Sequence, residues 1–185
     1  MKIAQLFILI LAFLVIKPAS AGLLVEPVLG YNFGKVEGDD LDDSANGPAF
    51  GGRIGYQNLG FQLGLDYLRS SLDIDNKIFK ENASISEFAG FVGFEFPILL
   101  RVYAGYIFSA TGEVEADLGM GKKDLEFKDG SGTKFGVGFT GLPFVDINFE
   151  YRKGTFGEWK YGSTKGDGDV DYSSFMVGVS LPFVL

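Results

Sequence analysis

The chain has 185 residues, of which 46% are hydrophobic, and it contains 27 glycines but no cysteine and no histidine. This length suits a single domain, and the lack of cysteine excludes disulfide bonds and thiolate metal sites. The formal net charge of −8 disfavours a nucleic-acid partner, because a binding surface would have to neutralise phosphates.

The first 21 residues are typical of a secretory signal. Lys2 precedes an apolar run at residues 6–16, and Ala19-Ser20-Ala21 is a small-residue cleavage motif. An uncleaved anchor is the alternative, but the apolar run is shorter than the roughly 20 residues that a spanning helix needs. We therefore expect cleavage after Ala21, which makes residues 1–21 a signal peptide and residues 22–185 the mature domain.

Most of the remaining sequence alternates between apolar and small or polar residues, and this period of two is typical of strands with two different faces. In the first segment, Leu29, Tyr31 and Phe33 alternate with Gly30 and Asn32. No stretch of eighteen apolar residues follows the signal segment, which excludes helical membrane spans. The pattern predicts eight strands, at residues 23–34, 50–56, 61–67, 87–96, 100–108, 134–140, 145–152 and 174–183.

The connections between these segments alternate in length. Tight links are expected near Asn58-Leu59 and at residues 97–99 and 141–143. The other connections are long and rich in glycine and charge, at residues 35–48, 70–85, 110–133 and 153–171. A meander with short turns on one side and long loops on the other, and with both termini on the short-turn side, is what an outer-membrane barrel requires.

The two faces of the strands differ in residue size as well as polarity. One set is crowded with Phe, Tyr, Leu and Val, and the other mixes glycine with charges of both signs, which suits a small polar lumen. A soluble barrel with an apolar interior that carries a ligand is the alternative. Aromatic residues gather near both ends of the predicted strands, as they do at the two membrane–water interfaces of outer-membrane barrels. This pattern favours the transmembrane barrel over the soluble one. The prediction is an all-β fold, an eight-stranded antiparallel up-and-down transmembrane β-barrel.

On this pattern the mature chain resembles the small outer-membrane barrels of the OmpX type and the membrane domain of OmpA. Its terminal run also resembles the signal that such barrels present to the barrel assembly machinery, with Gly178, Leu181 and Phe183 at the matching positions. The chain ends in Leu185 where an aromatic residue is usual. The resemblance implies a monomer in the outer membrane of a Gram-negative-type bacterium, in contact with its lipids and lipopolysaccharide.

Charged residues on the polar face are expected to form ion pairs that fill the lumen, because an unpaired charge in a narrow barrel is costly. For these ion pairs, a structural role is favoured over a role as a proton relay or a gate. The expected pairs are Glu95 with Arg101, Lys134 with Glu150, and Arg53 opposite or diagonal to Asp66.

No catalytic residue, cofactor or metal site is expected. The small-barrel enzymes that look similar in architecture rely on a catalytic histidine, which this chain lacks. The Asp167-Gly-Asp169-Val-Asp171 run begins like an EF-hand loop, but Tyr172 stands where glycine is required. The acidic loops are therefore interpreted as solvated.

The leading functional hypothesis is a non-enzymatic barrel that contributes to envelope integrity or to surface interaction through long extracellular loops. Phe156, Trp159 and Tyr161 are expected as exposed aromatic residues in the fourth loop, where they could contact a surface partner. Packing of these residues on one another above the barrel is the alternative. The alternative is a narrow porin-like channel for water, ions or very small solutes, because the predicted inner face is hydrophilic and rich in glycine.

Overall fold

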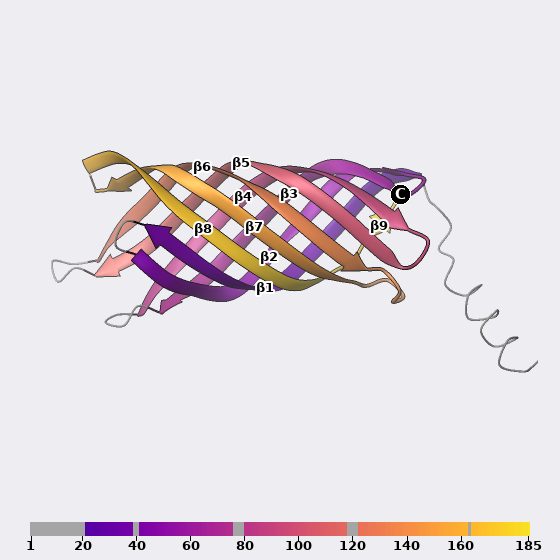
Figure 1. The fold of residues 1–185 in the computed structure, drawn as a ribbon, viewed down its shortest axis with the longest axis horizontal. Coiled ribbons are helices and arrows are strands. Elements are labelled where there is room, and N and C mark those ends of the chain that lie inside the picture. The colour runs from indigo at the N-terminus through magenta and orange to yellow at the C-terminus, as the bar shows by residue number, and fades with distance from the viewer. Residues whose placement is uncertain (1–20, 39–40, 76–79, 118–121, 163) are drawn as a thin grey trace, which may run out of the picture.

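The computed structural model describes residues 21–38, 41–75, 80–117, 122–162 and 164–185. The predicted signal segment at residues 1–20 lies outside this part of the chain. Long antiparallel strands account for nearly all of the described residues (Figure 1). They are β1 (Gly22–Gly38), β2 (Leu41–Asn58), β3 (Phe61–Asp75), β4 (Lys80–Phe96), β5 (Leu100–Asp117), β6 (Lys122–Phe139), β7 (Asp146–Tyr161), β8 (Thr164–Ser180) and the short β9 (Phe183–Val184).

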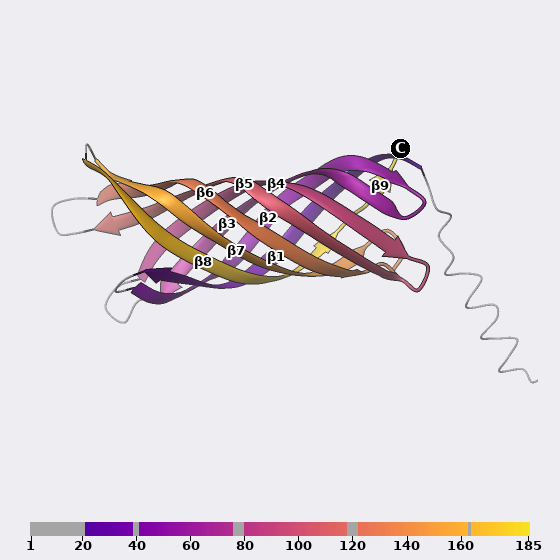
Figure 2. The same ribbon diagram turned by 45° about the horizontal axis from the view of Figure 1, so that its top comes forward.

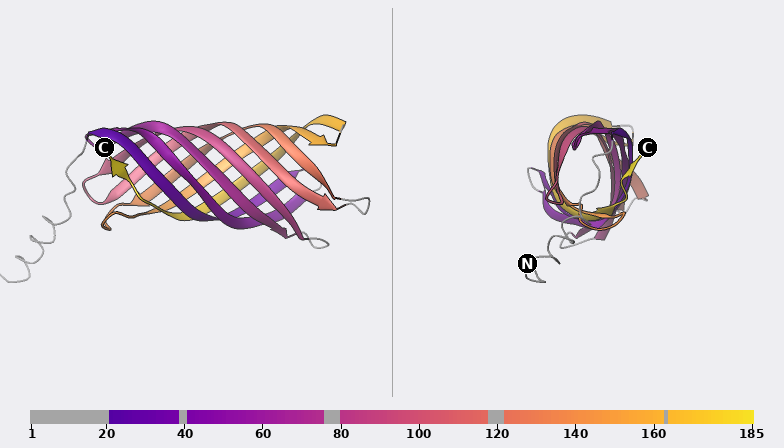
Figure 3. Two further views of the ribbon diagram at one scale, coloured as in Figure 1. Left: turned by 180° about the vertical axis from the view of Figure 1, so that it is seen from behind. Right: turned by 90° about the vertical axis from the view of Figure 1, so that its right-hand side faces the viewer.

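The strands close into a barrel. Each strand from β2 to β8 pairs with the next in sequence, and β1 pairs with both β2 and β8. Strand β9 continues β8 beyond Pro182 and pairs with β1 through Leu24 and Val184. The start of β1 and the C-terminus lie at the same end of the barrel (Figure 3). The predicted eight-stranded antiparallel barrel is confirmed.

The strands tilt strongly relative to the barrel axis (Figures 1 and 2). When paired residues are followed once around the barrel from Gly22, the path returns to β1 at Asn32. This stagger is what closure of a small barrel requires. It brings residues from non-neighbouring strands to the same depth inside the lumen.

The apolar face points outward. Large hydrophobic side chains on this face are about half exposed, for example Phe33 at 53%, Phe50 at 53% and Phe135 at 54%. The inward positions are small, polar or charged, and Glu26, Arg101 and other ionic groups are buried there. A barrel that carries an apolar ligand inside would have the opposite arrangement, so this alternative is wrong. Within the described residues, no helix is long and apolar enough to cross a membrane.

The turns at the end near the termini are tight, as predicted. Leu59 and Gly60 both have positive φ, at 50° and 87°, between the paired residues Asn58 and Phe61. This conformation is the type I′ turn that matches the twist of a hairpin. Leu99 and Phe144 supply the positive φ in the other two connections.

The four long loops predicted at the other end are mostly strand, so that prediction is wrong in extent. The ladder between β5 and β6 continues to Asp117 and Lys122, and the ladder between β7 and β8 continues to Tyr161 and Thr164. Glycine and charge disfavour strands only weakly when neighbouring strands supply hydrogen-bond partners. The chain therefore turns only after the strands have passed well beyond their predicted ends.

Glycines on the inner face make room for aromatic rings from neighbouring strands. A methyl group added at Gly136 would lie 2.1 Å from the Tyr103 ring, and one added at Gly154 would lie 2.5 Å from the Tyr172 ring. Gly166 lies in the same way against Trp159. The high glycine content is thus partly a packing requirement of a narrow, filled barrel.

An apolar cluster fills the half of the lumen farther from the termini. It contains Ile85, Ile107, Phe156 and Tyr172, and the Phe156 and Tyr172 rings stack with centroids 5.0 Å apart. Phe156 is only 3% exposed, and Trp159 packs on Gly166. The expectation that Phe156, Trp159 and Tyr161 project from a loop is therefore wrong, because all three belong to strand β7 and none of them is fully exposed.

Candidate functional site

The ionic side chains of the lumen form one connected network rather than separate pairs. At the end nearer the termini, Arg101 holds the Glu26 carboxylate with two nitrogens, at 2.7 and 2.9 Å. The same guanidinium donates to Asn148 Oδ1 at 2.7 Å and lies 3.6 Å from Asp146. Such bidentate arginine–carboxylate contacts hold both side chains in a defined orientation and also neutralise their charges.

Arg53 lies at the centre of the network. Its Nε donates to Asp66 at 2.9 Å, its Nη2 to Glu150 at 2.8 Å, and its Nη1 contacts Glu26 at 3.3 Å. The guanidinium carbon also lies 4.3 Å from the centroid of the Tyr103 ring. Arg53 thereby joins carboxylates from β1, β3 and β7.

Further from the termini, Arg152 bridges Glu150 and Glu87. The Tyr172 hydroxyl donates to the second oxygen of Glu87 at 2.8 Å, which ties the network to the apolar cluster. Lys134 lies 2.6 Å from Asp66 and 3.9 Å from Glu150. Every carboxylate named here therefore contacts at least one cation inside the barrel.

The three expected pairs have different outcomes. Arg53 and Asp66 are directly opposite on β2 and β3 and form an ion pair. Lys134 is opposite Arg152 rather than Glu150, because the turn after β6 shifts the register by two residues. The expected ion pair with Glu150 is nevertheless present at 3.9 Å, although the closest carboxylate to Lys134 is that of Asp66 at 2.6 Å.

Glu95 and Arg101 are opposite each other in the β4–β5 ladder, but no ion pair joins them. Arg101 turns instead to Glu26, which lies on a strand that is not its neighbour. The strand pattern placed Glu26 on the inner face, yet its partner could not be predicted from hairpin neighbours alone. Glu87 and Arg152 were likewise placed on the inner face, and their contact with each other could not be predicted from hairpin neighbours.

The network leaves little space in the lumen. Its members are almost completely buried, with exposed side-chain fractions of 5% or less. The end-on view in Figure 3 shows only the backbone ring, whose interior these side chains fill. Since the apolar cluster lies beyond the network, both halves of the interior are occupied.

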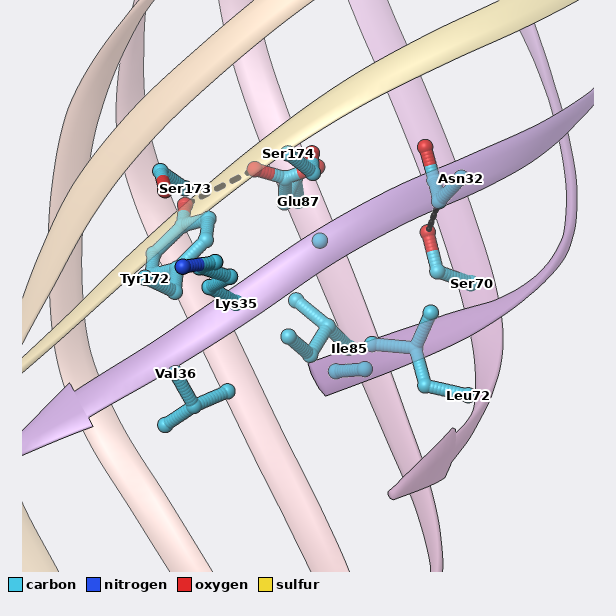
Figure 4. Close-up of a pocket in the computed structure, with 12 residues that line it drawn as sticks. Asn32, Lys35, Val36, Ser70, Leu72, Ile85, Glu87, Tyr172, Ser173 and Ser174 are labelled. Atoms are coloured by element: carbon cyan, nitrogen blue, oxygen red, sulfur yellow. Dashed lines mark hydrogen bonds between the residues drawn. The ribbon is translucent and has the colours of Figure 1, made fainter. Parts of the chain in front are cut away.

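A cavity of about 20 Å³ remains between Asn32, Ser70, Glu87 and Tyr172 (Figure 4). Asn32 donates to Ser70 at 2.7 Å, while its own Oδ1 is buried without a partner. This volume suits about one water molecule with polar neighbours. It is far too small for an organic ligand of ordinary size.

The residues of the predicted assembly signal lie on β8, on β9 and in the link between them. Gly178 faces inward on β8, opposite Gly30 and Asn148, while Leu181 and Phe183 are 40% and 50% exposed on the outer face. Their contact with the barrel assembly machinery stays a prediction.

Four strands extend farther than the others at the end opposite the termini (Figure 1). We call this extension the rim and define it as residues 112–117, 122–128, 155–161 and 164–170, from β5, β6, β7 and β8. Pairing between β8 and β1 stops at Asp171, so among the residues that the structure describes the β8 part of the rim is paired only with β7.

The rim carries exposed charges. Lys128 lies 2.8 Å from Glu126, and this contact lowers the pKa of the Glu126 carboxyl and raises the pKa of the Lys128 amine. Asp167, Asp169 and Asp171 belong to β8 and form no metal-binding cluster within the described part of the chain.

Comparisons with known proteins give a consistent result. A sequence model of the outer membrane protein β-barrel domain matches residues 7–183. The crystal structure of Neisserial surface protein A has a TM-score of 0.64 at 19% identity, with 89% of this chain and 99% of that chain covered.

A second similar structure is Ail, the attachment invasion locus protein of Yersinia pestis, in complex with the heparin analogue sucrose octasulfate. It has a TM-score of 0.62 at 13% identity, with 88% of this chain and 99% of that chain covered. No curated protein sequence matches the chain. At these identities the likeness concerns the fold.

Proposed function

Because the chain belongs to the family of outer membrane protein β-barrel domains, we propose that it is a surface-exposed, non-conducting barrel whose rim contacts a partner outside the cell. The barrel body is the anchor, and the rim is the functional surface. The observation that carries this proposal is the division of the molecule into a filled lumen and a protruding four-stranded rim. The predicted location in the outer membrane of a Gram-negative-type bacterium is part of the proposal.

A narrow pore is the competing function, since the inner face is hydrophilic. Conduction requires a continuous path with sites that bind ions weakly enough to release them. Arg53 instead joins three carboxylates across the lumen, and Phe156 and Tyr172 stack beyond it. Opening a path would separate buried charges from their partners, which is costly.

Catalysis by the clustered ionic residues is disfavoured for the same reason. Glu26 and Glu150 are fully buried, and each is held by at least two cations. A general acid or base has to come within hydrogen-bond reach of its substrate. No substrate larger than water reaches these carboxylates in this closed structure.

The charge of the rim indicates what kind of partner it fits. The sequence of the rim contains eight carboxylates and five amines. Ail was crystallised with the sulfated sugar sucrose octasulfate, but a surface with excess negative charge repels such a ligand. We therefore favour a partner with a neutral or basic surface.

The test compares a deletion strain complemented with the intact barrel or with a barrel of shortened rim. In the shortened variant residues 159–166 are replaced by Asn-Gly, which joins the paired residues Glu158 and Asp167 by a tight hairpin. Leu142→Ser, in the turn between β6 and β7 at the opposite end of the barrel, is the control. The readouts are attachment of cells to protein-coated surfaces and uptake of a hydrophobic dye.

We expect the intact barrel and the control to restore attachment, and the shortened barrel to fail while dye uptake stays the same in all three strains. Purified intact barrel is expected to show no saturable binding of sucrose octasulfate. Full restoration of attachment by the shortened barrel would contradict a role for the rim. Tight binding of sucrose octasulfate would contradict the proposed charge preference.

A further inference from the structure

The buried charges of the lumen do not balance. Among the described residues, the charged side chains buried inside the barrel are five carboxylates and four cations, namely Glu26, Asp66, Glu87, Asp146 and Glu150 against Arg53, Arg101, Lys134 and Arg152. The lumen therefore carries one negative charge in excess when all of these groups are ionised. A buried charge without compensation is costly, so the closed lumen needs one further positive charge.

A proton on one of the carboxylates is a poor source of this charge. Each of the five carboxylates already contacts at least one guanidinium or ammonium group. Glu87, for example, accepts hydrogen bonds from Arg152 Nη1 and, at 2.8 Å, from the Tyr172 hydroxyl. Protonation of such a carboxylate would weaken a charge-assisted hydrogen bond. A cation that binds other oxygen atoms of the lumen breaks none of these contacts.

The cavity of about 20 Å³ drawn in Figure 4 is lined by such oxygen atoms. Asn32 on β1 is only 3% exposed and lines the cavity, and its Oδ1 accepts no hydrogen bond from the described residues. The Ser70 hydroxyl, which accepts a hydrogen bond from Asn32 Nδ2, and the Glu87 carboxylate also belong to the lining. Ser174 on β8 adds a second hydroxyl. Hard cations prefer oxygen ligands of these kinds.

The position and size of the cavity suit a small cation without its hydration shell. The cavity lies where the ionic network meets the apolar cluster, because its lining includes Glu87 from the network and Leu72, Ile85 and Tyr172 from the cluster. Its volume holds about one particle of the size of a water molecule. This excludes magnesium, which keeps several of its waters. One excess charge and one water-sized space together match a single alkali-metal cation.

We propose that this cavity binds one alkali-metal cation, sodium or potassium, through Asn32 Oδ1, the Ser70 hydroxyl and the Glu87 carboxylate. The cation neutralises the excess charge of the lumen. A water molecule in the same place would satisfy Asn32 Oδ1 but would leave that charge uncompensated. The site is enclosed in the barrel body and does not depend on what the rim binds.

The test measures urea unfolding of the purified full-length barrel in phosphatidylcholine vesicles at constant pH. Sodium chloride or potassium chloride replaces choline chloride at constant ionic strength, so that charge screening is the same in every sample. Asn32→Leu removes the free carbonyl oxygen, and Asp146→Asn removes the excess charge at a residue outside the cavity lining. Gln62→Leu is the matched control, because it removes another buried amide, which donates to Gln57 near the turns.

For the native barrel, we expect the folding equilibrium constant to rise about tenfold for each tenfold increase of sodium or potassium above its dissociation constant, as one bound ion requires. The salt that acts at the lower concentration identifies the cation. The dependence should be absent from Asn32→Leu and unchanged in Gln62→Leu. In Asp146→Asn the affinity for the cation should be at least about threefold weaker, because one negative charge is lost.

The comparison is made between salts within each variant, so a general loss of stability does not affect it. Equal unfolding midpoints of the native barrel in choline, sodium and potassium chloride would mean that the cavity holds only water, and would overturn the proposal. An affinity for sodium or potassium that is unchanged in Asn32→Leu or in Asp146→Asn would also overturn it.

Discussion

Arg53 on β2 and Glu150 on β7 are 97 residues apart in sequence and lie on strands that do not pair, yet Nη2 and Oε2 of the two side chains are 2.8 Å apart inside the barrel. This contact exists only in the closed barrel. It connects the order of the strands to the stability of the lumen.

Replacement of Glu150 by Gln should strongly destabilise the barrel. Glu150 neutralises Arg53 and Arg152 and lies within 3.9 Å of Lys134. Removing one member of a buried ionic network leaves its partners uncompensated, which costs about 3–5 kcal/mol. Urea unfolding in lipid vesicles, followed by the fluorescence of the single tryptophan, measures this loss. Glu113→Gln, at an exposed position on β5, should change the unfolding free energy by less than about 0.5 kcal/mol.

Glu26 and Glu95 should respond differently to the same substitution. Glu26 is held by Arg101 and Arg53, whereas Glu95 forms no ion pair in the part of the chain that the structure describes. Glu26→Gln should lower the unfolding free energy by several kcal/mol, about as much as Arg101→Met, and Glu95→Gln should have little effect. Equal losses of unfolding free energy for the two glutamate variants, measured by the same urea titration, would support the hairpin pairing of Glu95 with Arg101 and contradict the contact of Arg101 with Glu26.

Gly136→Ala should destabilise the barrel because the new methyl group would lie 2.1 Å from the Tyr103 ring. Overpacking of this kind costs about 1–3 kcal/mol. Gly90→Ala is the matched control, since its methyl group would meet no atom closer than 4.0 Å. In a Tyr103→Leu background the extra cost of Gly136→Ala should largely disappear. A cost that persists there would mean that the backbone, and not the ring, requires glycine.

Lys128→Gln should raise the pKa of the Glu126 carboxyl toward its ordinary value. The hydrogen bond and charge of Lys128 lower this pKa, and Lys160 at 3.8 Å contributes less. A folded-state pKa below the unfolded value stabilises the protein above the unfolded pKa, and this contribution is lost as the pH falls through the folded pKa. Because the pair is solvent-exposed, the thermal midpoint near neutral pH should not change measurably.

NMR titration of the side-chain carboxyl groups measures these pKa values directly. Lys160→Gln should give a smaller upward shift of the Glu126 pKa than Lys128→Gln. The reverse order would mean that Lys160 is the main partner of Glu126.

The sequence alone was sufficient to predict the barrel, its strand number and the orientation of its faces. The alternation of apolar with small or polar residues is a local property that each strand shows independently. On β1, for example, the alternate residues Leu29, Tyr31 and Phe33 all lie exposed on the outer face. The tight turns could be located because apolar strands end and restart within a few residues. The resemblance to small outer-membrane barrels, which rested on this pattern, is confirmed by the family match.

The contacts inside the lumen were predictable only in part. Arg53 and Asp66 are neighbours across a two-residue turn, so their register follows from the sequence. Lys134 and Glu150 are separated by a longer turn, and the predicted register between β6 and β7 was wrong by two residues. Contacts such as Arg101 with Glu26 depend on the stagger of the closed sheet, which no single hairpin contains.

The extent of the strands was also underestimated, because glycine and charge at residues such as Gly166 and Asp167 were interpreted as signs of a loop. In the structure these residues pair with Trp159 and Glu158 in the rim. The tryptophan ring needs the glycine beneath it. The two features that were read as a loop and an exposed aromatic residue are thus parts of one packing arrangement.

Single-channel conductance of the refolded barrel in a planar bilayer tests the closed lumen most directly, after heat-dependent gel mobility has shown that the barrel is folded. The ionic network around Arg53 and the apolar cluster beyond it predict a silent membrane. Steady and reproducible conductance steps from the native barrel would contradict this account, and would make the lumen, rather than the rim, the site of function.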